Sequence, residues 1–146
     1  MVRRTRLDGS TCPVARSVDA IGDWWSLLIV RDAFDGSRRF GEFQRSLGVA
    51  KNILSARLRA LVEAGILEPV PASDGSAYRE YALTAKGRDL FPVIVALRQW
   101  GERHSFEPGE PHSELLDRAG RPLSPIEIRD ADGRPIRPED TRVEKV

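Results

Sequence analysis

The hydrophobic and polar positions in the first part of the chain follow the period of amphipathic helices. After Pro13, which suits the first position of a helix, apolar residues return every three or four positions until Gly22. Asp23 is a suitable N-cap for a second helix, WWSLLIVRDAF. The apolar positions of this second helix are numerous, and we expect its buried face to comprise Trp24, Leu27, Leu28 and Phe34.

A short helix and a longer helix follow, separated by a tight turn. The stretch FGEFQRSL, residues 40–47, places its apolar side chains on one face, and Gly48 ends it. The next helix is predicted over about 50–64, with Leu54, Leu58 and Leu61 as a buried stripe at positions i, i+4 and i+7.

Two strands and a last helical region complete the pattern. The segments ILEPVPAS and AYREYAL are typical of strands around a turn at Asp74-Gly75. Thr84 is a good N-cap for a long helix, in which Pro92 either starts a second segment or introduces a kink. A three-helix core, a two-stranded ribbon and a long last helix predict an α+β fold of the winged helix-turn-helix type. In that fold the third core helix, here residues 50–64, enters the major groove of DNA.

The outward side of the 50–64 helix carries side chains suited to reading DNA. With the leucines inward, a step of about 100° per residue turns Asn52 and Arg59 outward, with Ser55 on the flank. Lys51 lies at the amino end. Asn pairs with adenine, Arg pairs with guanine, and Lys mostly contacts phosphate. The alternative interpretation is a solvated face that only keeps the protein soluble.

Three further arginines complete the candidate DNA-binding set. Arg79 follows the turn of the ribbon, where it either reaches the minor groove or a phosphate, or belongs to a plain hairpin. Arg38 and Arg39 precede the short helix. There they either contact phosphate or pair with Asp35 or Glu42.

Composition divides the chain and excludes several classes of protein. Residues 1–106 hold 16 Lys and Arg against 12 Asp and Glu, whereas residues 107–146 hold 7 against 10 and 6 of the 10 prolines. We therefore expect a DNA-binding and dimerisation domain over 1–106 and an extension over 107–146. No apolar run reaches the roughly 18 residues of a membrane helix, and no apolar segment follows the basic first residues. We expect a cytoplasmic protein with neither membrane contact nor signal peptide.

The extension contains a 13-residue repeat. The pattern D-x-x-G-R-P-[LI]-x-P occurs at 117–125 and again at 130–138. Its glycine turns and short apolar pieces predict small β hairpins, with an irregular tail as the alternative. The second copy also resembles a calcium loop, but Ile128 stands where the first acidic ligand belongs. A single cysteine also excludes a disulfide within the chain and a multi-cysteine zinc site, so we expect no metal.

The one cysteine, Cys12, directly precedes the helix-opening Pro13. The positive end of a helix dipole stabilises a thiolate, which makes Cys12 a candidate sensor of oxidants or electrophiles. A lone cysteine is more often an inert small hydrophobe, and that alternative stays open.

Aromatic and histidine residues raise two further possibilities. The aromatic side chains belong to the core or to a dimer interface, or line a pocket for a small-molecule effector; they are Trp24, Trp25, Phe34 and Trp100. No paired catalytic group or phosphate-binding loop accompanies His104 and His112. We therefore expect neither an enzyme nor a cofactor.

Several of these features, taken together with their spacing, resemble the HxlR-type winged-helix regulators of bacteria, which are relatives of the MarR group. The resemblance covers about residues 12–104 and rests on Cys12-Pro13, Ile21-Gly22, Trp24-Trp25, Arg39-Phe40, Glu42-Phe43, Leu54 with Leu58 and Leu61, Glu63 with Gly65, Tyr81, Leu83-Thr84 and Lys86-Gly87.

The resemblance implies a transcription factor that binds double-stranded operator DNA as a homodimer. It implies that the first and last helices, 13–22 and 84–105, build the dimer interface, for which the apolar candidates are Val14, Val18, Phe91, Ile94, Leu97 and Trp100. It also implies that Cys12 occupies the position that some members use for redox sensing. An interaction module without specific DNA binding, or a regulator controlled by a small molecule, remains the alternative.

The chain departs from the family pattern in three places. Ala50 stands where a capping Ser or Thr is usual, and the ribbon tip reads Gly75-Ser-Ala-Tyr78 in place of the usual wing residues. Some members carry a zinc-ribbon-like extension, whose cysteine positions are here occupied by Arg129 and Asp132.

Overall fold

The computed structural model describes residues 5–146, which form two compact units. The first unit ends at Pro92 and the second begins at Val93. The boundary expected near residue 106 from the shift in composition stays a prediction.

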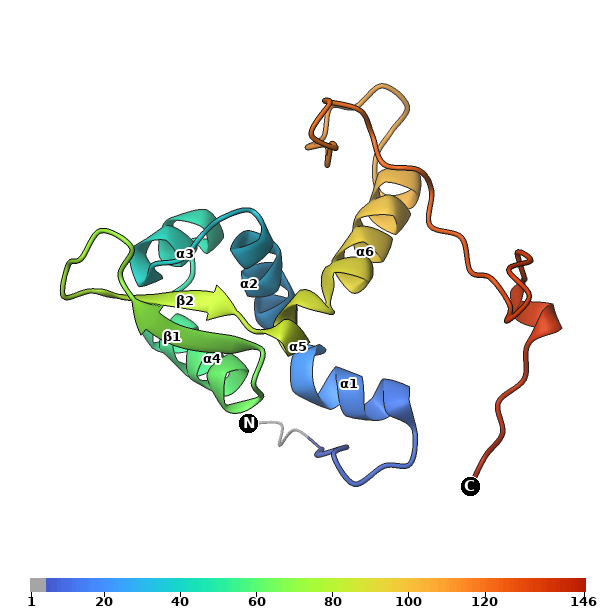
Figure 1. The fold of residues 1–146 in the computed structure, drawn as a ribbon, viewed down its shortest axis with the longest axis horizontal. Helices are drawn as coiled ribbons and strands as arrows, with labels where there is room; N and C mark the ends of the chain where they lie inside the picture. The colour runs from blue at the N-terminus through green and yellow to red at the C-terminus, as the bar shows by residue number, and fades with distance from the viewer. Residues whose placement is uncertain (1–4) are drawn as a thin grey trace. The chain divides into compact units, whose positions relative to one another are not determined.

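The described part of the first unit is a three-helix core with a two-stranded ribbon, and it confirms the predicted α+β winged helix-turn-helix fold (Figure 1). Its elements in chain order are α1 (Pro13–Ile21), α2 (Trp24–Phe34), α3 (Phe40–Leu47), α4 (Lys51–Glu63), β1 (Leu67–Pro71), β2 (Arg79–Leu83) and α5 (Ala85–Arg88). Helix α6 (Phe91–His104) follows, and a 3-10 turn at Pro138–Asp140 lies near the chain end.

The leucine stripe of α4 forms the centre of the core. Leu54, Leu58 and Leu61 are each 1% exposed, as predicted from their spacing. They pack in the same core as Phe43 of α3 and Ile29 of α2, which are fully buried. Burial of a leucine side chain contributes roughly 1.5–3 kcal/mol, so the stripe fixes which side of α4 faces outward.

The predicted buried face of α2 is wrong at Trp24, which is 73% exposed. The buried positions of α2 are instead Ser26, Ile29, Val30 and Asp32. The apolar residues of α2 occur on all sides of the helix, so their spacing does not identify one buried face. Trp24 is also the first residue of the helix, directly after the cap. The cap itself is as predicted, since Asp23 accepts a 2.8 Å hydrogen bond from the Ser26 backbone N–H.

A tight turn joins α3 to α4. Gly48 adopts φ +62°, a left-handed conformation that glycine tolerates best, and its N–H closes α3 onto Gln44. Ala50 is the N-cap residue of α4, and no side-chain hydrogen bond caps that end. The amino end of α4 therefore keeps free backbone N–H groups.

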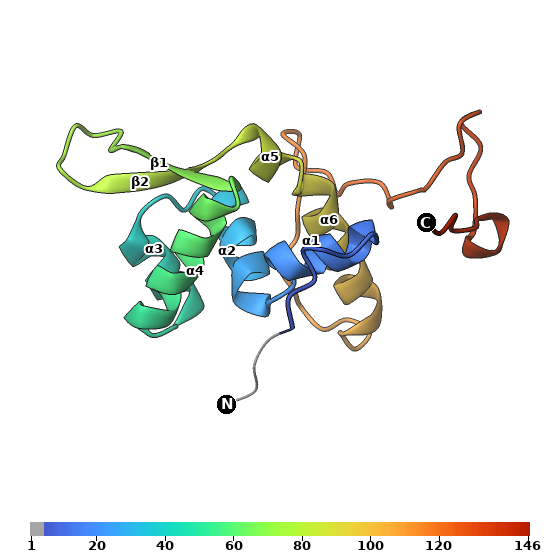
Figure 2. The ribbon, with the colours of Figure 1, turned by 90° about the horizontal axis from the view of Figure 1, so that it is seen from below.

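The ribbon packs over α3 and α4, and the turn between its strands lies at the end away from α5 (Figure 2). Its strands are antiparallel, with Leu67 opposite Leu83 and Pro71 opposite Arg79. On the other side of β2, the Tyr81 N–H donates a 2.7 Å hydrogen bond to the Arg38 carbonyl. Strand β1 is thus the edge, where prolines are tolerated because no ladder donor is required.

Three residues explain the connection from the ribbon to α6. Thr84 caps α5 by accepting a 3.0 Å hydrogen bond from Gly87 N–H. A Cβ at Gly87 would lie 2.2 Å from the Ile66 carbonyl oxygen, so only glycine fits this crossing. Pro92 starts a second helical segment rather than kinking one long helix, because at the first turn its missing N–H removes no hydrogen bond.

In the second unit, α6 is followed by the extension, whose regular structure is sparse. One isolated β-bridge joins Leu116 to Pro122 and another joins Arg129 to Pro135. Each bridge closes one copy of the repeat.

Candidate nucleic-acid interface

The outward face of α4 presents the polar side chains expected there. Lys51, Asn52, Ser55 and Arg59 are all exposed, while the leucines on the opposite side are buried. Lys51 and Asn52 belong to the first turn, where the helix dipole is positive and the backbone N–H groups have no side-chain cap. The structure therefore brings together a cation, an amide and free N–H donors at one helix end.

Arg57 has a different task from the other two cations of α4, Lys51 and Arg59. Its Nε lies 3.6 Å from Asp23 Oδ1, and Asp23 also accepts hydrogen bonds from the backbone and the hydroxyl of Ser26. This ion pair links the middle of α4 to the amino end of α2. Arg57 thus helps to orient the helix, and Arg59 remains directed outward.

Arg38 and Arg39 are joined to the wing through Glu80, a residue that the sequence analysis did not single out. Glu80 is 3% exposed and lies in β2. Its Oε1 accepts a 2.8 Å hydrogen bond from Arg38 Nε, and its Oε2 lies 3.4 Å from Arg39 Nε. Ser73 at the start of the ribbon turn donates to the same carboxylate at 3.1 Å. We refer to Glu80 with Arg38, Arg39 and Ser73 as the wing clamp.

The ribbon tip adds two contacts to Arg39. The Nη2 atom of Arg39 pairs with Asp74, and the Arg39 guanidinium lies 5.8 Å from the centre of the Tyr78 ring. The carboxylates that pair with Arg38 and Arg39 side chains are thus Glu80 and Asp74, whereas Glu42 accepts from the Arg38 backbone N–H. Each guanidinium has five N–H donors, so the remaining ones stay available to a phosphate.

The electrostatics of the clamp favour its charged form. The hydrogen bond from Arg38 lowers the pKa of the Glu80 carboxyl, against the opposing effect of burial. The Ser76 backbone N–H, followed by Arg39, lowers the pKa of Asp74 to about 2. Asp74 in turn raises the pKa of Arg39. The carboxyl groups of Glu80 and Asp74 therefore stay charged at neutral pH.

Arg79 lies at the other side of the ribbon from Glu80, because successive strand residues point to opposite faces. Its side chain is exposed at the start of β2, next to the turn. The structure thus places Arg79 on the wing without engaging it in the clamp.

The remaining candidates lie outside this surface. Cys12 is exposed and is the N-cap residue of α1. On the same helix, Val14 is 69% exposed and Val18 is 48% exposed. In α6, Leu97 and Trp100 are 49% and 63% exposed. Ile94 is half-buried, and Phe91 makes an edge contact with Phe34 at 5.4 Å between ring centres.

Residues 5–146 contain neither a metal-binding cluster nor a membrane-spanning helix. No group of three or more His, Cys, Asp or Glu side chains in this range is placed to hold a metal ion. None of its helices has both the length and the apolar composition needed to cross a membrane.

The wing clamp predicts a pH-dependent effect of Glu80→Gln. Because folding lowers the Glu80 pKa, the stabilisation by its charge is fully present above the value of an unfolded glutamate, about 4.3, and is lost as the pH falls below it. Urea denaturation at pH 7 should show a lower midpoint for Glu80→Gln than for the parent, and the difference should shrink near pH 4. Glu68→Gln, on the exposed edge strand, is the control and should change little at either pH. An equal loss for Glu80→Gln at both pH values would contradict the clamp.

Known proteins resemble this chain in sequence and in structure. The family model for the HxlR-like helix-turn-helix matches residues 20–108. Rv3095 of Mycobacterium tuberculosis, an uncharacterized HTH-type transcriptional regulator, is 46% identical over 110 residues, which cover 75% of this chain and 68% of that protein. The crystal structure of PA1607, a candidate transcription factor, is 57% identical with a TM-score of 0.90 and covers 95% of this chain and 98% of its own.

A further structural relative is the redox regulator HypR in its reduced form. It is 32% identical, with a TM-score of 0.59, over 64% of this chain and 94% of HypR. The family model spans most of the chain, including the α3–α4 helix-turn-helix and the wing. The chain therefore belongs to the HxlR-like helix-turn-helix family and is a transcriptional regulator.

Proposed function

We propose that this regulator binds specific operator DNA as a homodimer, with α4 of each protomer in the major groove. The observation that carries the proposal is the outward face of α4, where Asn52, Ser55 and Arg59 are exposed opposite the buried leucine stripe. The groove is about 12 Å wide and admits one helix. Asn52 and Arg59 are suited to base edges, and Ser55 to either a base or a phosphate.

The amino end of α4 supplies phosphate contacts. Because Ala50 provides no capping oxygen, the backbone N–H groups of the first turn can donate to phosphate oxygens, which the helix dipole also attracts. Lys51 adds a positive charge at the same end. These contacts position the helix but carry little sequence information.

The wing supplies contacts beside those of α4. The clamp holds Arg38 and Arg39 near the turn end of the ribbon, and Arg79 lies exposed on the ribbon itself. Arginine in a wing reaches the minor groove or the adjacent phosphates. We assign Arg38, Arg39 and Arg79 to this role.

Exposed apolar side chains support the homodimer. Val14 and Val18 are exposed on α1, and Leu97 and Trp100 are exposed on α6. Large apolar groups gathered on a helix face are typical of a protein interface. We assign these residues, with Phe91 and Ile94 beside them, to the interface between protomers.

Cys12 gives the regulator a means of responding to oxidants or electrophiles. It is an exposed thiol at the amino end of α1, and α1 belongs to the proposed dimer interface. Hydrogen peroxide converts the Cys12 thiolate to a sulfenic acid with release of water or hydroxide. Because the chain has one cysteine, no second thiol of the same chain can react with this sulfenic acid. The sulfenic acid then condenses with a small thiol, or with Cys12 of the other protomer, and a second water leaves. Either product changes the interface.

A charge-matched pair of variants tests the DNA-binding proposal. Lys51→Ala should lower the affinity for selected and for unrelated DNA by a similar factor, because its partner is phosphate. It should also reduce the slope of log affinity against log salt by about 0.9 for each protomer. Fluorescence anisotropy over a salt series measures both quantities.

Arg118→Ala removes the same charge from an exposed position of the extension and serves as the control; neither quantity should change. Equal behaviour of the two variants would remove Lys51 from the interface. Failure to enrich any sequence from random duplexes with the full chain would overturn specific DNA binding itself.

Oxidation of Cys12 should change operator affinity by about fivefold or more, a typical coupling between two sites. The measurement compares binding before and after peroxide treatment, with mass spectrometry to confirm that Cys12 is fully modified. Cys12→Ser should bind equally before and after treatment. Unchanged binding by the fully modified protein would exclude a sensory role.

A further inference from the structure

The two copies of the 13-residue repeat form the same turn. In the first copy, Asp117 N–H donates to the Arg121 carbonyl at 2.8 Å, and Asp117 Oδ1 accepts from the Ala119 and Arg121 N–H groups. In the second copy, Asp130 makes the equivalent bonds with Asp132 and Arg134. The repeat is therefore a structural unit, used twice.

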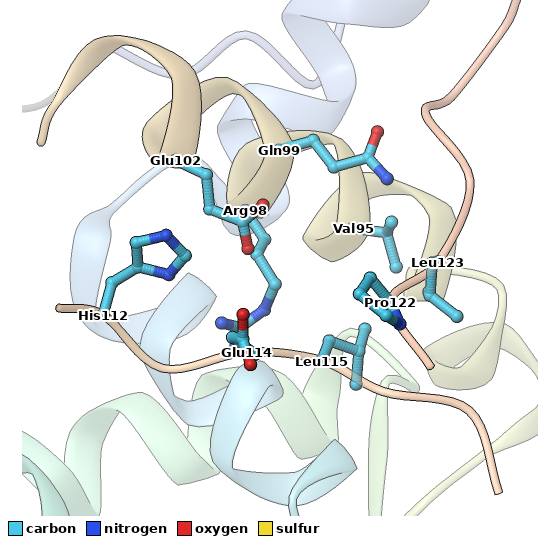
Figure 3. A pocket seen from close by; sticks show the side chains of 9 residues that line it. All are labelled: Val95, Arg98, Gln99, Glu102, His112, Glu114, Leu115, Pro122 and Leu123. Atoms are coloured by element: carbon cyan, nitrogen blue, oxygen red, sulfur yellow. The ribbon is translucent and has the colours of Figure 1, made fainter. Parts of the chain in front are cut away.

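The first copy packs on α6 of its own chain. Leu115, Pro122 and Leu123 gather on the same side as Val95, around a cavity of about 60 Å³ (Figure 3). This cavity is far below the roughly 300 Å³ of a pocket for an organic ligand, so its walls are packing surfaces. Gln99 fixes the segment further by donating to the Ser124 carbonyl and accepting from the Ile126 N–H.

The second copy repeats these apolar positions without a helix beneath them. A period of 13 places Ile128, Pro135 and Ile136 where the first copy has Leu115, Pro122 and Leu123. Ile128 is nevertheless 64% exposed. The hydrogen bonds and ion pairs found for residues 127–146 stay within that segment, for example Ile136 N–H to the Ile128 carbonyl. We refer to residues 127–146 as the arm.

We infer that the arm packs against a second copy of this chain, with Ile128, Pro135 and Ile136 on an apolar helix face of that copy. The inference rests on the homodimer of the proposed function and extends it. Ordering each backbone residue costs about 1–2 kcal/mol, which few contacts within the arm offset. A second apolar surface, equivalent to the one that α6 offers the first copy of the repeat, supplies the missing burial.

Helix α6 shows such a surface. Val95, Gln99 and Glu102 border the first copy of the repeat, whereas Val93, Leu97 and Trp100 lie about 200° away around the helix and are 41%, 49% and 63% exposed. Leu97 and Trp100 already belong to the proposed dimer interface, and Val93 extends that interface along α6. Twenty extended residues span up to about 66 Å, several times the roughly 10 Å width of a helix, so the arm can reach it on a partner.

Charge and the structural relatives favour a second copy over DNA. The arm carries 6 acidic and 5 basic residues, so it has no net positive charge that would attract phosphates. The similarity to PA1607 omits only 5% of this chain, about 7 residues, so it includes most of the arm. HypR matches over 94% of its own length but only 64% of this chain, so the extension is an addition to the fold and is not required by it.

Sedimentation equilibrium of the full chain provides the first test. Ile128→Asp should raise the dimer dissociation constant about tenfold or more, because an apolar contact is lost and a charge is buried. Ala131→Asp adds the same charge at the exposed turn of the same repeat and should change the constant less than about twofold. Equal dissociation constants for Ile128→Asp and the parent would overturn the inference.

Photo-crosslinking shows directly which chain the arm contacts. Ile128→p-benzoylphenylalanine is compared with Leu115→p-benzoylphenylalanine, in dimers mixed from unlabelled and nitrogen-15-labelled chains. Position 115 should crosslink within one chain, and position 128 should give crosslinks that join the two isotopes. Crosslinks from position 128 that join only peptides of one chain, or that form only with added DNA, would contradict the inference. A protein that stays monomeric would instead refute the homodimer, while a stable dimer without crosslinks between chains would refute the arm contact alone.

Discussion

The arrangement of this regulator depends on the packing of the α4 leucine stripe into the core of the first unit. Leu54, Leu58 and Leu61 leave only one side of the helix free, and that side carries Asn52 and Arg59. A helix rotated by one residue would turn about 100° and exchange a leucine for a polar group in the core, at a cost of several kcal/mol. The same burial that stabilises the domain therefore fixes which side chains the protein can offer to DNA.

The wing depends on a second constraint, which is electrostatic. Glu80 is a buried carboxylate, and its burial is tolerated because Arg38, Arg39 and Ser73 donate to it. Removing one partner from such a group generally costs more than the pair contributes. The clamp therefore couples the start of α3 to the ribbon, so the wing and the helix-turn-helix form one surface. In the proposed complex the two arginines serve both the fold and the DNA.

Most of the fold followed from local sequence signals. Gly48, the leucine period and the strand pattern around Asp74-Gly75 predicted the helix-turn-helix and the ribbon, because each signal acts over a few residues. Trp24 was misplaced because α2 is apolar on all sides, so its orientation depends on its neighbours. Glu80 was missed because its two arginine partners lie about 40 positions away in the chain, and no local pattern marks such a pair. The positions of the candidate DNA-binding side chains followed from the helix period. The base or phosphate that each of them would contact did not follow from it.

The central claim is that two copies of α4 read one symmetric operator. Hydroxyl-radical footprinting of the full chain on a sequence that it selects from random duplexes tests this claim most directly. The account predicts two equivalent protected regions, related by two-fold symmetry, with centres about one helical turn or 34–36 Å apart. A single unsymmetrical region, or no discrete protection on any selected sequence, would contradict it.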